Sequence, residues 1–299
     1  MAFLGISVSI LAQLFNGTVS VFDKFLLSRN LRPTNFAFWI SLTSLSVFIL
    51  LPFGFALPAS NQWFVDLAAG ATFVLAVFFM YVALEREEVT RVIPIIGCLT
   101  PVFTLLISNV YLGESFVRSE IIAIGILLLG IVLLTYRHSP KHTNHLILAS
   151  AYAAAFLFAL SSVLMKEIFT SQGFISGLCW SRLGGLIIIP IVLLDRQTRY
   201  EIFVRRKVPQ KGNFLVFLVG RIFSGGGFIL INLAYSLISP VIVNSLQGIQ
   251  YALIFVANLT LKPIFPKIIT ENYSRRLLLV KILGLVTIII GTIILSRTI

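Results

Sequence analysis

The sequence is poor in charge and in cysteine. Asp, Glu, Lys and Arg make up only 11% of its 299 residues, against about 25% in an ordinary soluble domain, and 58% of the residues are hydrophobic. A soluble fold of this length could not bury so much apolar surface in its core. The two cysteines, Cys98 and Cys179, both lie in apolar stretches, which excludes a disulfide-stabilised secreted domain. The composition instead favours a protein that is embedded in a bilayer.

Several enzyme motifs are also absent. The sequence has no Gly-rich phosphate loop followed by Lys and Ser or Thr, and neither His-Glu-x-x-His nor Gly-x-Ser-x-Gly. His138, His142 and His145 lie close together, but we expect no metal site there, because a hydrophobic chain has few other places for histidine. We therefore expect no catalytic residue, no cofactor and no enzymatic activity. A non-transporting sensor is the remaining alternative of a different class.

Apolar runs long enough to cross a bilayer account for most of the chain. A transmembrane helix needs about 20 mostly apolar residues. Ten such runs fit, and they leave only short connections between them. The predicted fold is therefore an all-α polytopic membrane protein, with spans at Phe3–Leu26, Asn35–Ala56, Trp63–Leu84, Val89–Leu112, Glu120–Tyr136, His145–Phe169, Gly173–Leu194, Phe214–Leu237, Val241–Leu261 and Leu277–Leu295.

The basic residues are distributed unevenly between the connections. Seventeen of the 23 Lys and Arg residues follow the odd-numbered spans. Short connections rich in Lys and Arg stay in the cytoplasm, so the count puts the odd-numbered connections inside and both chain ends outside. The net charge of +12 is then an orientation signal rather than a nucleic-acid site. The other basic residues are Arg118, Lys166 and Arg297 on the opposite side, and Arg182, Arg221 and Lys281 within spans.

The two halves of the chain resemble each other, which predicts repeats at residues 1–142 and 143–299. Residues 20–25 match residues 162–167, and Trp39 matches Trp180. A unit of five spans, repeated in tandem, places its second copy upside down in the membrane. Inverted repeats are typical of alternating-access transporters, whose substrate site lies near the midplane. Two glycine pairs follow the same alignment, Gly97 with Gly248 and Gly130 with Gly291.

Several motifs resemble those of the EamA-type branch of the drug/metabolite transporter superfamily. They are Lys24 at the end of the first span, Pro94-Ile95-Ile96-Gly97 and Pro101 in the fourth, Tyr111-Leu112-Gly113-Glu114 after it, and Gly125 and Gly130 in the fifth. The resemblance implies a carrier of small metabolites, often an exporter, with a central cavity between the halves. It also implies cytoplasmic chain ends, opposite to the charge count. The second half departs from the pattern at Leu261-Lys262-Pro263.

Two arginines within predicted spans are the leading candidates for substrate binding. Arg182 lies about nine residues into the seventh span and Arg221 about seven residues into the eighth. An ionisable residue at membrane depth is costly and often functional. Either guanidinium could hold an anionic or carboxylate-bearing solute by paired hydrogen bonds. The alternatives are extension to the headgroups or bonding to carbonyls of a neighbouring helix.

Polar and aromatic residues extend the candidate substrate site. Asn244, Gln247 and Tyr251 share one face of a helix in the ninth span, either lining a cavity or holding helices together. Asn232 and Tyr235 follow Gly225-Gly226-Gly227, which permits close helix packing or local unwinding. The repeat-related Trp39 and Trp180 are predicted either to face a cavity or to pack in the core.

A second group of residues is predicted to contribute to a gate. Asp23 and Lys24 lie where the first span ends, and Lys166 is the repeat mate of Lys24. Pro94 and Pro101, seven residues apart in the fourth span, predict a kink that suits either a gate or simple packing.

Carboxylates are absent from the middle of the predicted spans. No Asp or Glu lies deep in any of them, which disfavours a proton-driven pump for cationic drugs. The sequence therefore predicts a monomeric secondary transporter in the cell (inner) membrane that exports small polar metabolites, such as amino acids or organic anions, by alternating access. The alternative is a flippase for a lipid-linked or polyprenyl-phosphate substrate, with Arg221 at the headgroup. The expected partners are a small solute and membrane lipid.

Overall fold

The computed structural model describes residues 2–26, 33–86, 89–136, 145–204, 214–264 and 274–298, and every regular element in these ranges is a helix. Helices are expected, because a backbone in hydrocarbon must satisfy its own hydrogen bonds. They are α1 (Ala2–Leu26), α2 (Pro33–Ser44), η1 (Leu45–Phe53), α3 (Trp63–Arg86), α4 (Val89–Ile107), η2 (Ser108–Leu112), α5 (Arg118–Thr135), α6 (His145–Gln172), α7 (Phe174–Leu193), α8 (Arg196–Phe203), α9 (Phe214–Leu237), α10 (Pro240–Ser245), α11 (Gly248–Leu261) and α12 (Arg275–Thr298).

These helices confirm the all-α polytopic fold. Within the described residues, nine helical segments are long and apolar enough to span a membrane, and α9 adds a shorter apolar stretch at Ile222–Leu237. Three predicted spans consist of two helical pieces each: α2 with η1, α4 with η2, and α10 with α11. The short α8 lies outside the spans, and the Asp195 carboxylate caps its N-terminus by accepting from the backbone N–H of Gln197 and Thr198.

The predicted span Val241–Leu261 is confirmed as an apolar span, Pro240–Leu261, but its helix is interrupted. The helix ends after Ser245 and restarts at Gly248, because the Gln247 N–H donates to the Asn244 carbonyl at 3.2 Å rather than to that of Val243. The Val243 carbonyl is thereby available to another donor, and it accepts from the Gln13 side-chain amide of α1 at 3.4 Å. A broken helix at this place brings free backbone groups into the protein interior.

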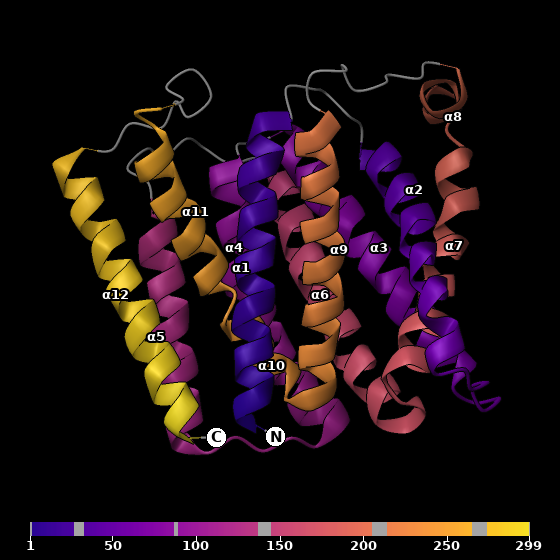
Figure 1. The fold of residues 1–299 in the computed structure, drawn as a ribbon, viewed down its shortest axis with the longest axis horizontal. Helices are drawn as coiled ribbons and strands as arrows, with labels where there is room; N and C mark the ends of the chain where they lie inside the picture. The colour runs from indigo at the N-terminus through magenta and orange to yellow at the C-terminus, as the bar shows by residue number, and fades with distance from the viewer. Residues whose placement is uncertain are drawn as a thin grey trace.

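The packing partners of the helices follow the inverted five-plus-five arrangement (Figure 1). α1 packs along α9, and its repeat counterpart α6 packs along α3. In the same way α4 contacts α6, while α11 contacts α1, and the two fifth helices, α5 and α12, pack on each other. The predicted boundary between residues 142 and 143 lies outside the described residues.

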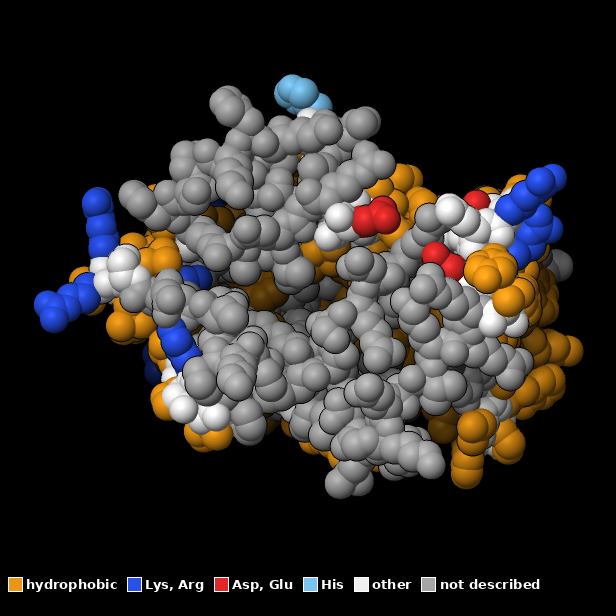
Figure 2. Space-filling view, turned by 90° about the horizontal axis from the view of Figure 1, so that it is seen from above, with side chains coloured by type: hydrophobic (Ala, Val, Ile, Leu, Met, Phe, Trp, Pro, Cys, Tyr) orange, Lys and Arg blue, Asp and Glu red, His pale blue; other side chains and the backbone are white. Residues whose placement is uncertain are grey.

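The two faces of the molecule differ in which segments they hold. Both ends of the described chain lie at the bottom of Figure 1, together with residues 113–117; we call this the terminal face. The opposite connection face holds α8 and the first residues of α12. Figure 2 looks onto the connection face and shows Lys and Arg side chains at two of its edges. The described arginines exposed on these helices are Arg196, Arg199, Arg275 and Arg276.

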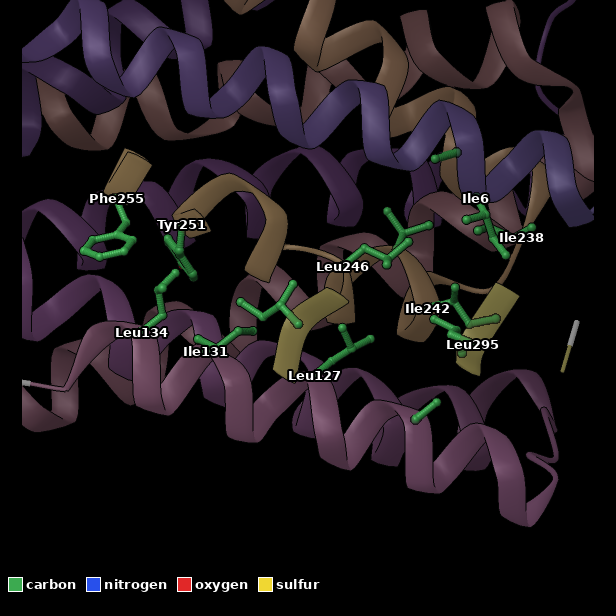
Figure 3. Close-up of a cluster of buried hydrophobic side chains, with 14 residues drawn as sticks. Ile6, Leu127, Ile131, Leu134, Ile238, Ile242, Leu246, Tyr251, Phe255 and Leu295 are labelled. Atoms are coloured by element: carbon green, nitrogen blue, oxygen red, sulfur yellow. The ribbon is translucent and has the colours of Figure 1, made fainter. Parts of the chain in front are cut away.

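The largest buried apolar cluster lies between α5, α12 and the broken helix (Figure 3). Leu127, Ile131 and Leu134 of α5 pack toward α10 and α11. Glycines bring α5 and α12 into close contact: a Cβ on Gly130 would lie 2.6 Å from the Ile288 side chain, and one on Gly284 2.6 Å from the Leu134 nitrogen. We call the α5–α12 pair, with its dense apolar packing, the scaffold.

Candidate functional site

Arg182 lies inside the protein rather than at the headgroups. Its side chain is 3% exposed. Nε and Nη2 donate to the Ser181 hydroxyl at 3.3 and 3.2 Å, and Nη2 reaches the Met165 sulfur at 3.3 Å. The guanidinium carbon lies 5.0 Å from the ring centre of Phe228 and 5.5 Å from that of Phe73. Four helices, α3, α6, α7 and α9, therefore contribute to one arginine environment.

The neighbours of Arg182 are electrically neutral. Among the described residues, no carboxylate forms an ion pair with it. A guanidinium has five N–H donors, and here a hydroxyl and a thioether are its acceptors. A buried charge without a counter-ion costs several kcal/mol, and cation–π contacts return only about 0.5–2 kcal/mol each. The site therefore attracts an anionic group strongly.

Phenylalanine rings surround the guanidinium. The ring of Phe73 lies 6.0 Å from that of Phe158 and 6.3 Å from that of Phe228, both in edge contact. We call Arg182, Ser181, Met165 and the three phenylalanines the Arg182 cluster. Apolar walls exclude water, which strengthens any charge interaction within them. The sequence did not identify these rings, because nothing distinguishes three phenylalanines among 26.

A hydrogen-bonded group centred on Asn244 lies next to the Arg182 cluster. The Asn244 amide nitrogen donates to Thr104 at 2.9 Å and to Ser162 at 3.0 Å, and its oxygen accepts from the Tyr235 hydroxyl at 2.8 Å. This Asn244 hub joins α4, α6, α9 and α10. Ser162 of the hub lies one helical turn before Met165 of the cluster on α6, so the two groups are neighbours along this helix. The structure thus favours the helix-joining role for Asn244.

Further polar contacts lie at the terminal face, two of them between the halves and one, from Lys166, within the second half. The Tyr111 hydroxyl donates to Glu167 at 2.5 Å, and Ser239 donates to Glu114 at 2.6 Å. Lys166 donates to the Ser236 carbonyl at 3.3 Å. Gly113, with φ of +66°, ends η2 in the left-handed conformation and turns the chain toward Glu114. We call the six side-chain and backbone partners Tyr111, Glu114, Lys166, Glu167, Ser236 and Ser239 the polar lock.

The two predicted tryptophans do not join the Arg182 cluster. Trp39 is 50% exposed on the outside of α2, in edge contact with Phe38. Trp180 donates its indole N–H to the Ala56 carbonyl at 2.7 Å and packs against Trp63. The expectation of a shared central cavity for this pair is therefore wrong for Trp39, because equivalence in the repeat does not fix which way a helix face points.

The polar stripe of the ninth span is divided by the helix break. Asn244 lies in α10 and Tyr251 in α11, while Gln247 lies at the break between them. The Tyr251 hydroxyl donates to the Ile93 carbonyl at 3.4 Å and its ring covers Gly97, so it joins α11 to α4. Asn232 donates to the Phe228 carbonyl at 2.8 Å within α9. Of the stripe, the structure brings only Asn244 next to the cluster.

Four predicted site residues have no described side chain, and a fifth, Pro101, contributes packing. The side chains of Arg221, Asp23, Lys24 and Pro94 lie outside the described part of the structure. Pro101 is buried in α4, which continues as an α-helix to Ile107 before the wider turns of η2.

The glycine run of the eighth span packs closely and does not unwind. A Cβ on Gly227 would lie 2.6 Å from the Asn16 side chain of α1, and one on Gly226 2.9 Å from Phe15. The chain is helical on both sides of these glycines.

Asp66 is a buried carboxylate that the sequence analysis missed. It is 0% exposed, and both of its oxygens accept from the Gln172 amide nitrogen at 3.0 Å. Its position, four residues into a predicted span, was a usable signal. Position along a helix does not measure burial, and here the end of α6 covers this turn of α3.

Comparisons with known proteins agree with this architecture. No curated protein matches the chain. A crystal structure whose title names no activity aligns over 99% of this chain and 99% of its own, with a TM-score of 0.71 and 15% identity, which shows a shared fold alone. Residues 3–136 match the EamA-like transporter family. This match over the first half confirms the resemblance to the EamA-like transporter family, which belongs to the drug/metabolite transporter superfamily, and the apolar helices indicate an integral membrane protein.

Proposed function

We propose that the protein is a secondary transporter that moves small polar metabolites bearing a carboxylate or another anionic group across the membrane by alternating access. The observation that carries the proposal is Arg182: a guanidinium at mid-helix, 3% exposed, with no carboxylate partner among the described residues. Its surroundings come from both halves, with Phe73 from the first and Met165 and Phe228 from the second. A site between the repeats is where such a transporter binds its solute.

The chemistry of the Arg182 cluster suits a carboxylate. A carboxylate can accept two parallel N–H bonds from a guanidinium, and it would replace the weaker acceptors Ser181 and Met165. Each hydrogen bond to a charged group contributes about 1.5–3 kcal/mol. The phenylalanine rings fit the apolar part of the solute and keep water from the ion pair.

The contacts toward the terminal face supply the elements of a gate. Along α6, Ser162 of the Asn244 hub comes first, Met165 of the Arg182 cluster lies one turn later, and Glu167 of the polar lock lies nearest to the terminal face. Release on the terminal face therefore requires the Tyr111–Glu167 and Glu114–Ser239 bonds between the halves to open. The excess of basic residues on the connection face favours its placement in the cytoplasm, and hence export.

The test is transport by purified protein in proteoliposomes, with a panel of radiolabelled amino acids and organic anions. We expect Arg182→Gln to reduce flux of the transported solute by about 10- to 100-fold, because about 1.4 kcal/mol of lost binding corresponds to a factor of ten. Arg118→Gln is the matched control, since Arg118 is exposed at the terminal face. Thermal unfolding of each variant verifies folding.

Two outcomes would contradict the proposal in different ways. Undiminished flux through Arg182→Gln would remove Arg182 from the substrate site. Movement of none of the panel solutes by the wild-type protein would refute small-solute transport itself. The same vesicles test the flippase alternative if a polyprenyl phosphate is included; that prediction depended on Arg221, whose side chain lies outside the described residues.

A further inference from the structure

Asp66 is the one carboxylate of the described residues that is completely buried within a membrane-spanning helix. It lies three residues after Trp63, the first residue of α3, and therefore about 4.5 Å along the helix at 1.5 Å per residue. Its described partner is the Gln172 amide at the end of α6, which donates from one nitrogen to both carboxylate oxygens at 3.0 Å. One shared donor leaves most of the acceptor capacity of an ionised carboxylate unused, since that group has about four lone-pair positions.

The charged groups on the surrounding helices are engaged elsewhere. On α6, Lys166 bonds the Ser236 carbonyl and Glu167 accepts from Tyr111. On α7, Arg182 lies between phenylalanine rings, and on α3 itself Glu85 is exposed at the other end of the helix. No described basic residue forms an ion pair with Asp66. An ionised Asp66 is therefore an uncompensated buried charge, which is strongly unfavourable.

Gln172, the partner of Asp66, has an acceptor that lacks a hydrogen-bond donor. The Gln172 side-chain oxygen is buried and has no hydrogen-bond donor among the described residues. A neutral carboxylic acid has an O–H donor as well as a carbonyl acceptor. It can therefore form a cyclic pair with an amide, in which the acid O–H donates to the amide oxygen and the amide N–H donates to the acid carbonyl. One added proton removes the buried charge and satisfies the Gln172 oxygen together.

We propose that Asp66 and Gln172 form a proton-binding site whose occupancy is coupled to transport. The step is the addition of one proton from water to a carboxylate oxygen of Asp66, with no other bond made or broken, and its reversal after the halves rearrange. The coupling, though not the proton site itself, rests on the proposed transport function. The proton site lies within the first turn of α3, close to the face through which water can supply or accept the proton.

A direct backbone contact connects the proton site to the Arg182 cluster. A Cβ on Gly184 of α7 would collide with the Leu67 carbonyl, and one on Gly70 of α3 would collide with the Ser181 carbonyl. Leu67 follows Asp66 in the chain, and Ser181 precedes Arg182. Because α3 and α7 touch through their backbones, a shift of α3 that follows a change of charge at Asp66 must also move α7. A proton at Asp66 and an anion at Arg182 would thus bias the same helix pair.

Infrared spectroscopy of the full chain in lipid nanodiscs tests the proton site without any substrate. The band of a protonated buried carboxylic acid should grow in the wild-type protein as the pH is lowered below neutral and be absent at every pH in Asp66→Asn. Glu85→Gln, at the exposed end of the same helix, is the matched control and should keep the band. The swapped pair Asp66→Asn with Gln172→Glu should restore an acid band, because it rebuilds the acid–amide pair with the roles exchanged. Identical spectra for wild type and Asp66→Asn would overturn the proton site.

Flux under an imposed pH gradient tests the coupling. We expect the wild-type protein and Glu85→Gln to respond to the gradient, Asp66→Asn to lose the response, and the swapped pair to regain it. A wild-type flux that ignores the pH gradient, or follows a sodium gradient instead, would overturn proton coupling even if the infrared band is present. A complete lack of transport would refute the proposed function, while the infrared result would still decide the proton site.

Discussion

Two helix pairs connect the halves by the same packing device but in different chemical settings. In α5–α12, Gly130 and Gly284 bring the backbones together inside an apolar cluster. In α3–α7, Gly70 and Gly184 do the same, but Asp66 and Arg182 lie within one helical turn of the contact. The difference shows that close packing by small residues is a general means of joining helices, and that ionisable groups beside such a contact distinguish a working interface from a scaffold.

The α5–α12 pair has one charged residue, Lys281, that reaches across from one helix to the other, and its role is local. Lys281 donates to the Leu134 carbonyl at 2.5 Å near the end of α5, and its ammonium lies 5.7 Å from the Phe255 ring centre. A cation at a helix C-terminus complements the helix dipole. This charge therefore stabilises a helix end, whereas Arg182 has no helix end to complement.

The largest effect is expected from adding one methyl group at a glycine contact of each helix pair, α3–α7 and α5–α12, which tests whether the two pairs differ in rigidity. Gly184→Ala should lower the free energy of unfolding by about 3 kcal/mol, since its Cβ meets the rigid Leu67 carbonyl. Gly291→Ala on α12 should cost less, about 2 kcal/mol, because the nearest atom, 2.8 Å away, belongs to the Leu127 side chain rather than to a backbone carbonyl. Thermal unfolding in detergent measures both. Gly125→Ala, with open space around it, is the control; equal losses at positions 184 and 291 would contradict the argument.

Removing the buried charge of Arg182 should stabilise the fold, whereas the glycine substitutions destabilise it. Arg182→Met keeps most of the volume and should raise the free energy of unfolding by about 2 kcal/mol, because an uncompensated buried charge is replaced by an apolar side chain. The same variant should lose transport. Comparison of melting temperature and flux measures the two effects in one preparation, with the exposed Arg118→Met as control. A destabilised Arg182→Met would indicate that the guanidinium holds the helices together rather than awaiting a ligand.

Substitutions in the Asn244 hub should lower the free energy of unfolding by an intermediate amount. Asn244→Ala removes the three hydrogen bonds to Thr104, Ser162 and Tyr235 and should cost about 1–2 kcal/mol. Tyr235→Phe, which removes only one of the three bonds, should cost about half as much. Chemical denaturation of both variants tests whether the hub is one cooperative unit; the reverse order of effects would show that Tyr235 stabilises the fold by other contacts.

The smallest effect should come from the charge on the scaffold side. Lys281→Met removes the bond to the Leu134 carbonyl and should cost about 0.3–1 kcal/mol, with transport retained. Unfolding and flux measurements check both statements. Loss of transport in Lys281→Met would mean that α5–α12 takes part in the transport cycle, and the division between the two helix pairs would then disappear.

Much of the fold follows from periodicity and length, which are local properties of the chain. The start of α9 at Phe214, the boundaries of α3 and the burial of Arg182 could all be expected from the sequence. The sequence could not predict which side chains of different helices contact each other, because these contacts depend on how each helix is rotated about its axis. For this reason Trp39 faces outward despite its repeat mate, and Phe73 and Phe228 meet Arg182 without any signal in the sequence.

The break at Leu246 and Gln247 was equally hidden. The interrupted segment, Val241–Leu261, contains no proline, and its one glycine, Gly248, does not by itself predict a helix end. At the interruption, the Gln247 N–H bonds the Asn244 carbonyl, and the Gln13 side-chain amide from the other half bonds the Val243 carbonyl in its place. Tertiary contacts of this kind override local helix preference.

The distribution of tryptophan has a practical consequence. All three indoles, Trp39, Trp63 and Trp180, belong to α2, α3 and α7, and α5 and α12 have none. Intrinsic fluorescence of the unlabelled protein therefore reports selectively on the helix pair that holds Asp66 and Arg182, while the scaffold is optically silent. Tryptophan emission can therefore follow how α3 and α7 respond to added solute or to a pH jump in vesicles, with no label attached to the protein.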